Sequence, residues 1–275
     1  GDERRRVIRA AHAEAVDEVV RYYEDHVVRA RSSERHRALV GTDGVIAAAF
    51  DHRASRAGDP LLHSHVVVAN FTRIDGGDEA GAWRALFSPA LFEHAKAGGH
   101  LYQAHLRRRL TEWLGVEFGP VVNGYADVQG IPDTVIEIFS KRRTEIEDGL
   151  AESGLTSARA AQVATLDTRR SKEYGVDAET LRERWHADAT DGGFDVAALE
   201  RCFGRVGVEA ITGGRIERLY ARLAGAEGLT ERASTFRRTE VIEAVASATG
   251  GSCTAPEVES LADGFLGSAH VVPVV

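Results

Sequence analysis

The apolar positions of the chain follow two different spacings, one typical of helices and one typical of strands. Residues 7–28 carry apolar side chains at helical spacing, which predicts a long helix in which Tyr22 and Tyr23 pack by their rings. Residues 45–50 and 66–69 are instead continuous apolar runs, and the second is rich in valine. Such runs predict strands that are buried on both faces. We expect these two strands to pair.

Helical spacing and terminal signals predict further elements along the chain. From Pro89 to Leu114 helices dominate, with a break expected at residues 98–99, and Asn123-Gly124 predicts a type I′ hairpin. The apolar residues 271–275 are expected to need a partner strand. Other helices are predicted over residues 132–150, 157–168, 178–186, 234–248 and 257–265. A linker at residues 191–193 divides the chain into a predicted domain over residues 1–193 and a helical region over residues 194–275.

Three histidines lie close to the two predicted strands. Alternate residues of a strand share a face, so His63 and His65 point the same way, with Cα atoms roughly 6.5–7 Å apart. The turn-forming residues 58–60 let the chain double back, and they bring His52, at the end of the first strand, beside His63. One such pair on a strand is a weak signal, because a histidine in a strand is usually a hydrogen-bonded core or surface residue. The third imidazole makes the group a candidate metal site.

The donor set of this site limits its chemistry. Three neutral imidazoles suit Zn, Ni, Cu or Fe and leave coordination positions open, as catalytic sites do. The remaining histidines lack partners at ligand spacing or, for His100 and His105, do not share a helix face. We expect surface or capping roles for His12, His26, His36, His94, His186 and His270. Cys202 and Cys253 are too few and too far apart for a metal site.

The segment from Asp51 to Asn70 resembles the histidine-triad motif of conjugative relaxases of the F-plasmid type, the MobF or TrwC-like group of HUH endonucleases. Further segments resemble the same family in the expected order over about residues 1–200: Trp83-Arg84-Ala85-Leu86, Gly99-His100-Leu101-Tyr102-Gln103-Ala104-His105-Leu106-Arg107, Leu110-Thr111-Glu112-Trp113-Leu114-Gly115, residues 139–147, Thr168-Arg169-Arg170-Ser171-Lys172-Glu173 and residues 181–185. Residues 228–230 and 234–238 resemble the segment that leads into the helicase half of such proteins.

The resemblance implies a fold and a reaction. It implies an α+β fold with an antiparallel sheet flanked by helices, a helical subdomain that covers the DNA and a small C-terminal helical region. It also implies strand-specific nicking and rejoining of single-stranded DNA at a plasmid transfer origin by a tyrosine, with a divalent metal ion (Mg, Mn or Zn) on His52, His63 and His65. Other relaxosome proteins are possible partners.

The chain departs from this family pattern at both ends. The family carries its nucleophilic tyrosines and an acidic residue near the start, and we expect both to lie upstream of Gly1. The absence of methionine and of a GxxxxGK[ST] element agrees with a fragment that is inactive alone and lacks the helicase half.

Charge determines where an anionic strand would bind. The net charge of −8 argues against a protein that coats nucleic acid regardless of its sequence, but the arginines are clustered. Any one cluster is an ordinary solvated helix face when it is considered alone. With the family resemblance, the candidates for phosphate contacts are Arg53, Arg56, Arg73, Arg107, Arg108, Lys141, Arg142 and Arg143. The arginine pair at residues 169–170 is a further candidate of the same kind.

Two other functions remain open from the sequence. One is a metal- and single-stranded DNA-binding module without its own nucleophile, and the other is a metallohydrolase whose histidines activate water. Against the hydrolase, no βα alternation repeats as a barrel would need. No apolar run of membrane-spanning length and no signal peptide is visible, so we expect a cytoplasmic bacterial protein without membrane insertion.

Overall fold

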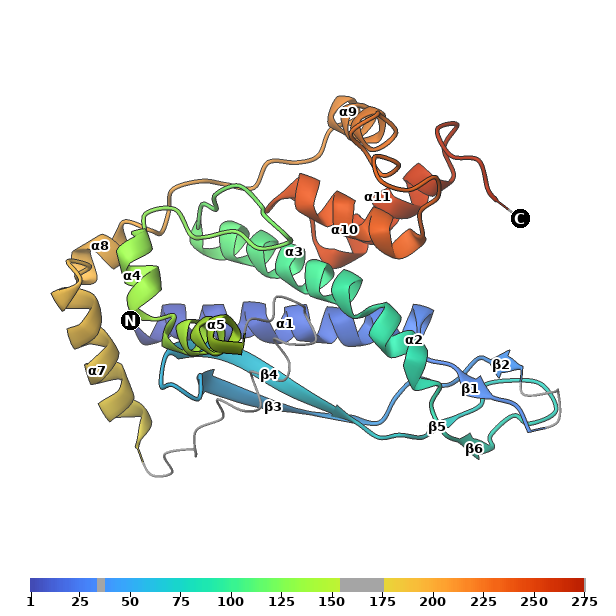
Figure 1. Ribbon diagram of the computed structural model, residues 1–275, viewed down its shortest axis with the longest axis horizontal. Helices are drawn as coiled ribbons and strands as arrows, with labels where there is room; N and C mark the ends of the chain where they lie inside the picture. The colour runs from blue at the N-terminus through green and yellow to red at the C-terminus, as the bar shows by residue number, and fades with distance from the viewer. Residues whose placement is uncertain (34–37, 154–175, 275) are drawn as a thin grey trace. The chain divides into compact units, whose positions relative to one another are not determined.

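The computed structural model describes residues 1–33, 38–153 and 176–274, and it shows the predicted α+β class (Figure 1). The helices are α1 (Asp2–His26), α2 (Ser88–Glu93), α3 (Ala95–Leu114), α4 (Asp133–Ile138), α5 (Lys141–Ser153), α7 (Ala178–Asp191), α8 (Val196–Glu200), α9 (Gly213–Leu223), α10 (Arg238–Thr249) and α11 (Ala255–Leu266). The strands are β1 (Ala30–Arg31), β2 (Leu39–Val40), β3 (Ala47–Ala54), β4 (Pro60–Val68), β5 (Thr72–Arg73) and β6 (Trp83–Arg84).

The strands form three two-stranded sheets, β1–β2, β3–β4 and β5–β6. In the two short sheets the strands are antiparallel, with Ala30 opposite Val40 and Thr72 opposite Arg84. The predicted hairpin at Asn123-Gly124 is also confirmed, because Val122 and Tyr125 are bridged and both turn residues have positive φ.

The chain divides into two compact units. Unit 1 comprises residues 1–49, 66–129 and 203–275, and unit 2 comprises residues 50–65 and 130–202. Each unit combines segments that are far apart in the chain, whereas the prediction was a single boundary at residues 193–194. That boundary stays a prediction.

The core of unit 1 is helical. On α1, Ala11, Ala15 and Tyr22 are buried at spacings of four and seven residues, which place them on one face of the helix. That face packs against α3, and α10 and α11 pack on α3 as well (Figure 1). The predicted long helix and the packing of Tyr22 are therefore confirmed.

Helix α3 does not break at residues 98–99 as predicted. It runs from Ala95 to Leu114, and the interruption falls earlier, at His94. A Cβ atom on Gly98 would lie 3.1 Å from the Tyr23 ring, so this glycine allows α1 and α3 to approach closely. Gly98 therefore serves helix packing rather than a turn.

One more predicted helix differs in the structure, and the C-terminal apolar segment has no partner strand within the described residues. The helix expected over residues 132–150 is divided into α4 and α5, with Phe139 and Ser140 between them. The apolar C-terminus forms no strand over residues 271–274, where Val272 and Val274 are exposed. The helix predicted over residues 157–168, the 169–170 arginine pair and His36 lie outside the described residues.

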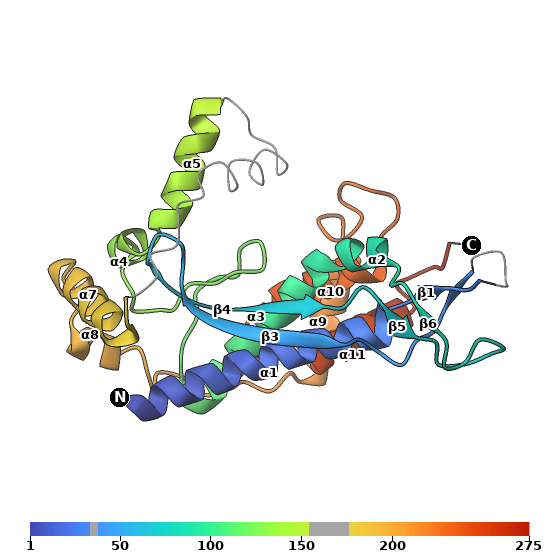
Figure 2. The same cartoon turned by 90° about the horizontal axis from the view of Figure 1, so that it is seen from below.

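The prediction that β3 and β4 are buried on both faces is wrong. Phe50 is 54% exposed and Val67 is 60% exposed. The physical reason is that a continuous apolar run is buried on both faces only where other elements pack on both faces of the strand, and the exposure of Phe50 and Val67 shows that such cover is incomplete here. Figure 2 shows the two strands running side by side as a long hairpin.

Candidate metal centre

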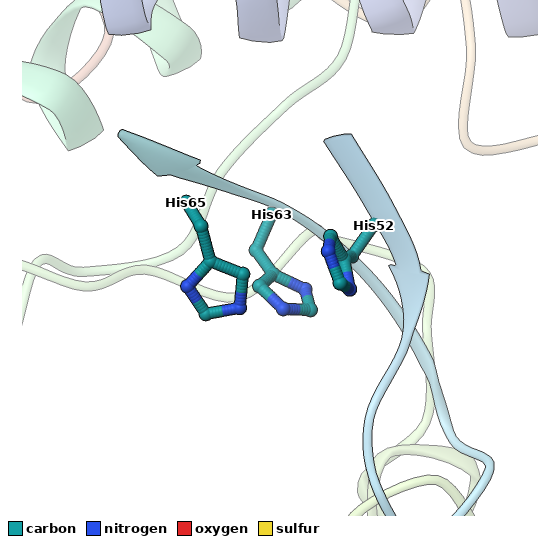
Figure 3. Close-up of side chains that lie close together, drawn as sticks. All are labelled: His52, His63 and His65. Carbon is teal, nitrogen blue, oxygen red and sulfur yellow. The ribbon is translucent and has the colours of Figure 1, made fainter. Parts of the chain in front are cut away.

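The β3–β4 hairpin brings the three predicted histidines together. His52 lies on β3, and His63 and His65 lie two residues apart on β4, so all three rings share one face (Figure 3). The ring centroids are 5.2 Å apart for His52 and His63, 4.8 Å for His52 and His65, and 5.1 Å for His63 and His65. One nitrogen from each ring lies within 4.8 Å of the others.

A cross-strand hydrogen bond supports this register. Ser64 Oγ donates to Asp51 Oδ1 at 2.5 Å. Both residues immediately neighbour a histidine in the chain, so they lie on the opposite face of the hairpin. Their bond pairs the two strands at the point that sets His52 beside His63.

One imidazole is already oriented by the backbone. His63 Nδ1 lies 3.0 Å from the carbonyl oxygen of Leu61. A carbonyl oxygen can only accept, so Nδ1 must carry the proton and Nε2 is left with its lone pair. Metal-binding histidines are commonly held in this way by a second hydrogen bond to a backbone carbonyl. His63 is therefore prepared to bind a metal through Nε2.

The turn of the hairpin is tied to the helices of unit 2. Ser55 Oγ donates to the buried carboxylate of Asp59 at 2.9 Å, and the backbone N–H of Arg142 at the start of α5 donates to the same carboxylate at 3.1 Å. From α7, Trp185 Nε1 donates to the carbonyl oxygen of Gly58 at 2.7 Å. These contacts hold the end of the hairpin that carries His52 and His63.

The residues of the site fit a metal ion. Histidine ligands bind zinc at about 2.0–2.1 Å, so the three nitrogens would have to draw closer together than they lie here. The rings are half-buried or exposed, which leaves them room to rotate. Three imidazoles leave positions for a substrate oxygen, so the arrangement suits Lewis-acid chemistry on an anion.

The other histidines do not add to the site, and one of them was assigned wrongly. His12 was expected at the surface, but it is buried, and its Nδ1 lies 2.7 Å from the hydroxyl of Tyr102. Burial lowers the pKa of both His100 and His105. His52, His63 and His65 form the candidate metal cluster found among the described residues.

The structure corrects the prediction for Arg107. Its side chain is only 2% exposed, and its guanidinium donates to the backbone carbonyls of Gly124 at 2.8 Å and of Gly250 at 3.2 Å. Burial lowers its pKa to about 10. A side chain held in this way is part of the core and is not available to a DNA phosphate.

The other predicted phosphate contacts differ in accessibility. Arg108 and Arg142 are mostly covered and lie beside carboxylates, Glu112 for the first and Glu145 for the second. The side chains that are exposed to solvent are those of Arg53, Arg56, Arg73, Lys141 and Arg143. Of these, Arg73 pairs with Asp43, Lys141 with Asp188 and Arg143 with Glu147.

Asp59 and Trp185 support the site but were not identified from the sequence as supporting residues. A buried indole N–H usually has a hydrogen-bond partner, and an aspartate in a turn commonly accepts hydrogen bonds, so the residue types of Trp185 and Asp59 indicated that each makes a hydrogen bond. Neither signal says which distant backbone group is contacted.

The fold and site together define an α+β protein with a three-histidine candidate metal centre on a β-hairpin. The TrwC relaxase family model matches residues 1–191. The chain belongs to the TrwC relaxase family, which confirms the resemblance to MobF relaxases.

Two curated relatives are multifunctional conjugation proteins named TraI. TraI of Escherichia coli is 35% identical over 195 residues, which cover 68% of this chain and 11% of that protein. TraI of Escherichia coli strain K12 is 31% identical over 245 residues, which cover 84% of this chain and 13% of that protein. The chain thus spans only a small part of the length of these relatives.

Solved structures of the conjugative relaxase TrwC are also similar. A metal-free complex of TrwC with oriT DNA matches with a TM-score of 0.61 and 31% identity, over 68% of this chain and 65% of that chain. A copper-bound complex of TrwC with oriT DNA matches with the same TM-score and identity, over 69% of this chain and 64% of that chain. No described helix of the present chain has the length and apolar character needed to cross a membrane.

Proposed function

We propose that this chain is part of a relaxase that nicks and rejoins single-stranded DNA at a plasmid transfer origin. We assign the divalent metal site to His52, His63 and His65. The observation that carries the proposal is the convergence of these three imidazoles on one face of the β3–β4 hairpin, in a member of the TrwC relaxase family. The similar protein TrwC is known in complex with oriT DNA in metal-bound and metal-free forms.

The donor set bears on the identity of the metal. Imidazole nitrogen suits Zn²⁺ and related transition metals, whereas Mg²⁺ prefers oxygen ligands. We therefore place Zn²⁺ first, Mn²⁺ after it and Mg²⁺ last. When bound, the ion would polarise a non-bridging oxygen of the scissile phosphate as a Lewis acid. The role of the protein is to hold and orient the histidine ligands, as the Leu61 carbonyl does for His63.

Tyr22, Tyr23 and Tyr220 are poorly placed to act as the nucleophile. Tyr22 is buried with its hydroxyl 2.7 Å from His94 Nδ1, and burial raises its pKa to about 12. Tyr23 donates to the Leu91 carbonyl, and Tyr220 donates to the Leu261 carbonyl. In the proposed reaction a tyrosine loses its proton and its oxygen bonds to the scissile phosphorus, while the bond from phosphorus to the 3′-oxygen breaks. The 3′-oxygen takes up a proton to become a free hydroxyl, and the reverse reaction rejoins the strand. The alternative function is a metal- and DNA-binding module that is catalytically incomplete.

The test uses a labelled single strand that spans the transfer origin, titrated with the full chain in Mn²⁺ and in EDTA. We expect Mn²⁺ to strengthen binding about tenfold, equivalent to about 1.4 kcal/mol, and His63→Ala to abolish that gain. The exposed His186 on α7 provides a control, because His186→Ala should keep the gain. Equal affinity in Mn²⁺ and EDTA would contradict the proposed role of the triad.

Denaturing electrophoresis of the same mixtures tests the nucleophile. We expect no covalent protein–DNA adduct from this chain alone. An adduct that disappears in Tyr22→Phe or Tyr23→Phe would overturn the assignment of the nucleophile, while leaving the metal site as it stands.

A further inference from the structure

Unit 1 contains a cleft between α9 and α10 that is lined by arginines. Its volume is about 250 Å³. Arg215, Arg218 and Arg222 line it from α9, and Ala248 and Thr249 line it from the end of α10. The two helices are in contact and lie near each other in Figure 1. The cleft lies outside residues 1–191, the part of the chain that the family model matches.

The three arginines share one side of α9 because they are spaced by three and four residues. Arg215 Nη1 lies 3.0 Å from Glu209, but Glu209 is 82% exposed, and such surface pairs are worth little. Arg218 and Arg222 are exposed, and no carboxylate within the described residues forms an ion pair with either of them. The cleft therefore keeps an excess of positive charge in a chain whose net charge is −8.

The remaining wall of the cleft is apolar. Ile211 and Leu219 line it together with Ala248. The hydroxyl of Thr249 already donates to the Val245 carbonyl at 3.0 Å, so it is not free to select a ligand. Guanidinium groups bind phosphate oxygens in a fork, while an apolar wall accepts the face of a base or sugar.

The spacing of the arginines suits more than one phosphate. Arg215 and Arg222 are seven residues apart, which is about 10 Å along a helix axis. Stacked nucleotides carry one charge about every 3.4 Å along a strand. We propose that the α9–α10 cleft binds the phosphate groups of a single-stranded nucleic acid, at a site separate from the histidine triad.

The test compares salt dependence in two double variants of the full chain. A labelled oligothymidylate is titrated at several salt concentrations in EDTA, so that metal at the triad makes no contribution. Each lost phosphate contact reduces the magnitude of the negative slope of log K against log[salt] by about 0.7, so Arg218→Gln with Arg222→Gln should make the slope less steep by about 1.4 and weaken binding. The control pair, Arg9→Gln with Arg232→Gln, removes the same charge from exposed positions outside the cleft and should change the slope less.

Equal slopes in the two double variants would overturn the proposal. Circular dichroism and the melting temperature confirm that each variant is folded.

Competition by thymidine monophosphate separates the two sources of phosphate, a single strand and a free nucleotide. We expect the mononucleotide to displace the strand only at much higher concentration. Equal affinity for the mononucleotide and the strand would overturn the assignment to a strand in favour of a free nucleotide. The outcome does not depend on the triad, so failure here leaves the proposed relaxase function unchanged.

Discussion

Arg107 carries its charge into the interior of unit 1 and donates there to backbone carbonyls rather than to a carboxylate. The sequence places it in a run of three arginines, and charge alone suggested a surface cluster. Helical spacing contained the better signal, because Ala104, Arg107 and Thr111 are separated by three and four residues and are all buried on α3. Periodicity should therefore be applied to charged residues as well as to apolar ones.

We predict that Arg107→Ala destabilises the fold by about 3 kcal/mol or more, because it leaves buried carbonyls without donors and opens a cavity. Arg143→Ala is the control, since that side chain is 79% exposed and its change should cost less than about 0.5 kcal/mol. Urea unfolding of both variants measures the difference. Equal stability of the two would show that Arg107 is not a core residue.

The β3–β4 hairpin shows what could be predicted at the scale of an element. Strand alternation and the turn at residues 58–60 were enough to bring His52 beside His63 and His65, because both are local properties of the chain. The burial of the same strands could not be predicted, because burial depends on which distant elements cover a face. The contacts of Asp59 with α5 and of Trp185 with α7 are likewise long-range, and no local pattern specifies them.

We predict that Trp185→Phe weakens metal binding at the triad several-fold without abolishing it. Phenylalanine keeps most of the apolar ring but removes the N–H that donates to the Gly58 carbonyl, so the hairpin turn is less well held. Trp113→Phe, on α3 in unit 1, is the matched control and should leave metal affinity unchanged. Isothermal titration with Mn²⁺ gives both affinities. An unchanged affinity in Trp185→Phe would remove this residue from the support of the site.

At the scale of the whole molecule, helices with clear terminal signals were predicted better than the organisation of the units. The helix predicted over residues 257–265 is confirmed as α11, with Thr254 and Glu257 forming a capping box, whereas the helix predicted to start at residue 234 begins at Arg238 as α10. The two units could not be predicted, because each is assembled from segments far apart in the sequence. Only the packing of a face against distant segments decides such an arrangement.

Three partly or fully buried histidines predict how stability depends on pH. Burial lowers the pKa of His94, His100 and His105 below 6.5, the ordinary value for histidine. The unfolded chain therefore takes up protons first as the pH falls. Stability is fully present above pH 6.5 and is lost progressively between that value and the lower pKa values of the folded state.

We predict that the free energy of unfolding, measured by urea titration in EDTA, falls as the pH is lowered from 7.5 to about 5.5. His105→Gln should make this dependence shallower, because it removes one of the buried titrating groups. His186→Gln, at an exposed position, should leave the dependence on pH as it is in the parent. A free energy that does not change between these pH values would contradict the assignment of these histidines as neutral buried groups.

The central claim is that His52, His63 and His65 bind one divalent metal ion, and isothermal titration calorimetry with Mn²⁺ or Zn²⁺ tests it most directly. We predict one site per chain, a loss of tight binding in each single alanine variant, and unchanged binding in His186→Ala. Two imidazoles alone make a weak site, so loss of any one ligand should be sufficient. A variant with alanine at all three positions that binds metal as tightly as the parent would contradict the claim.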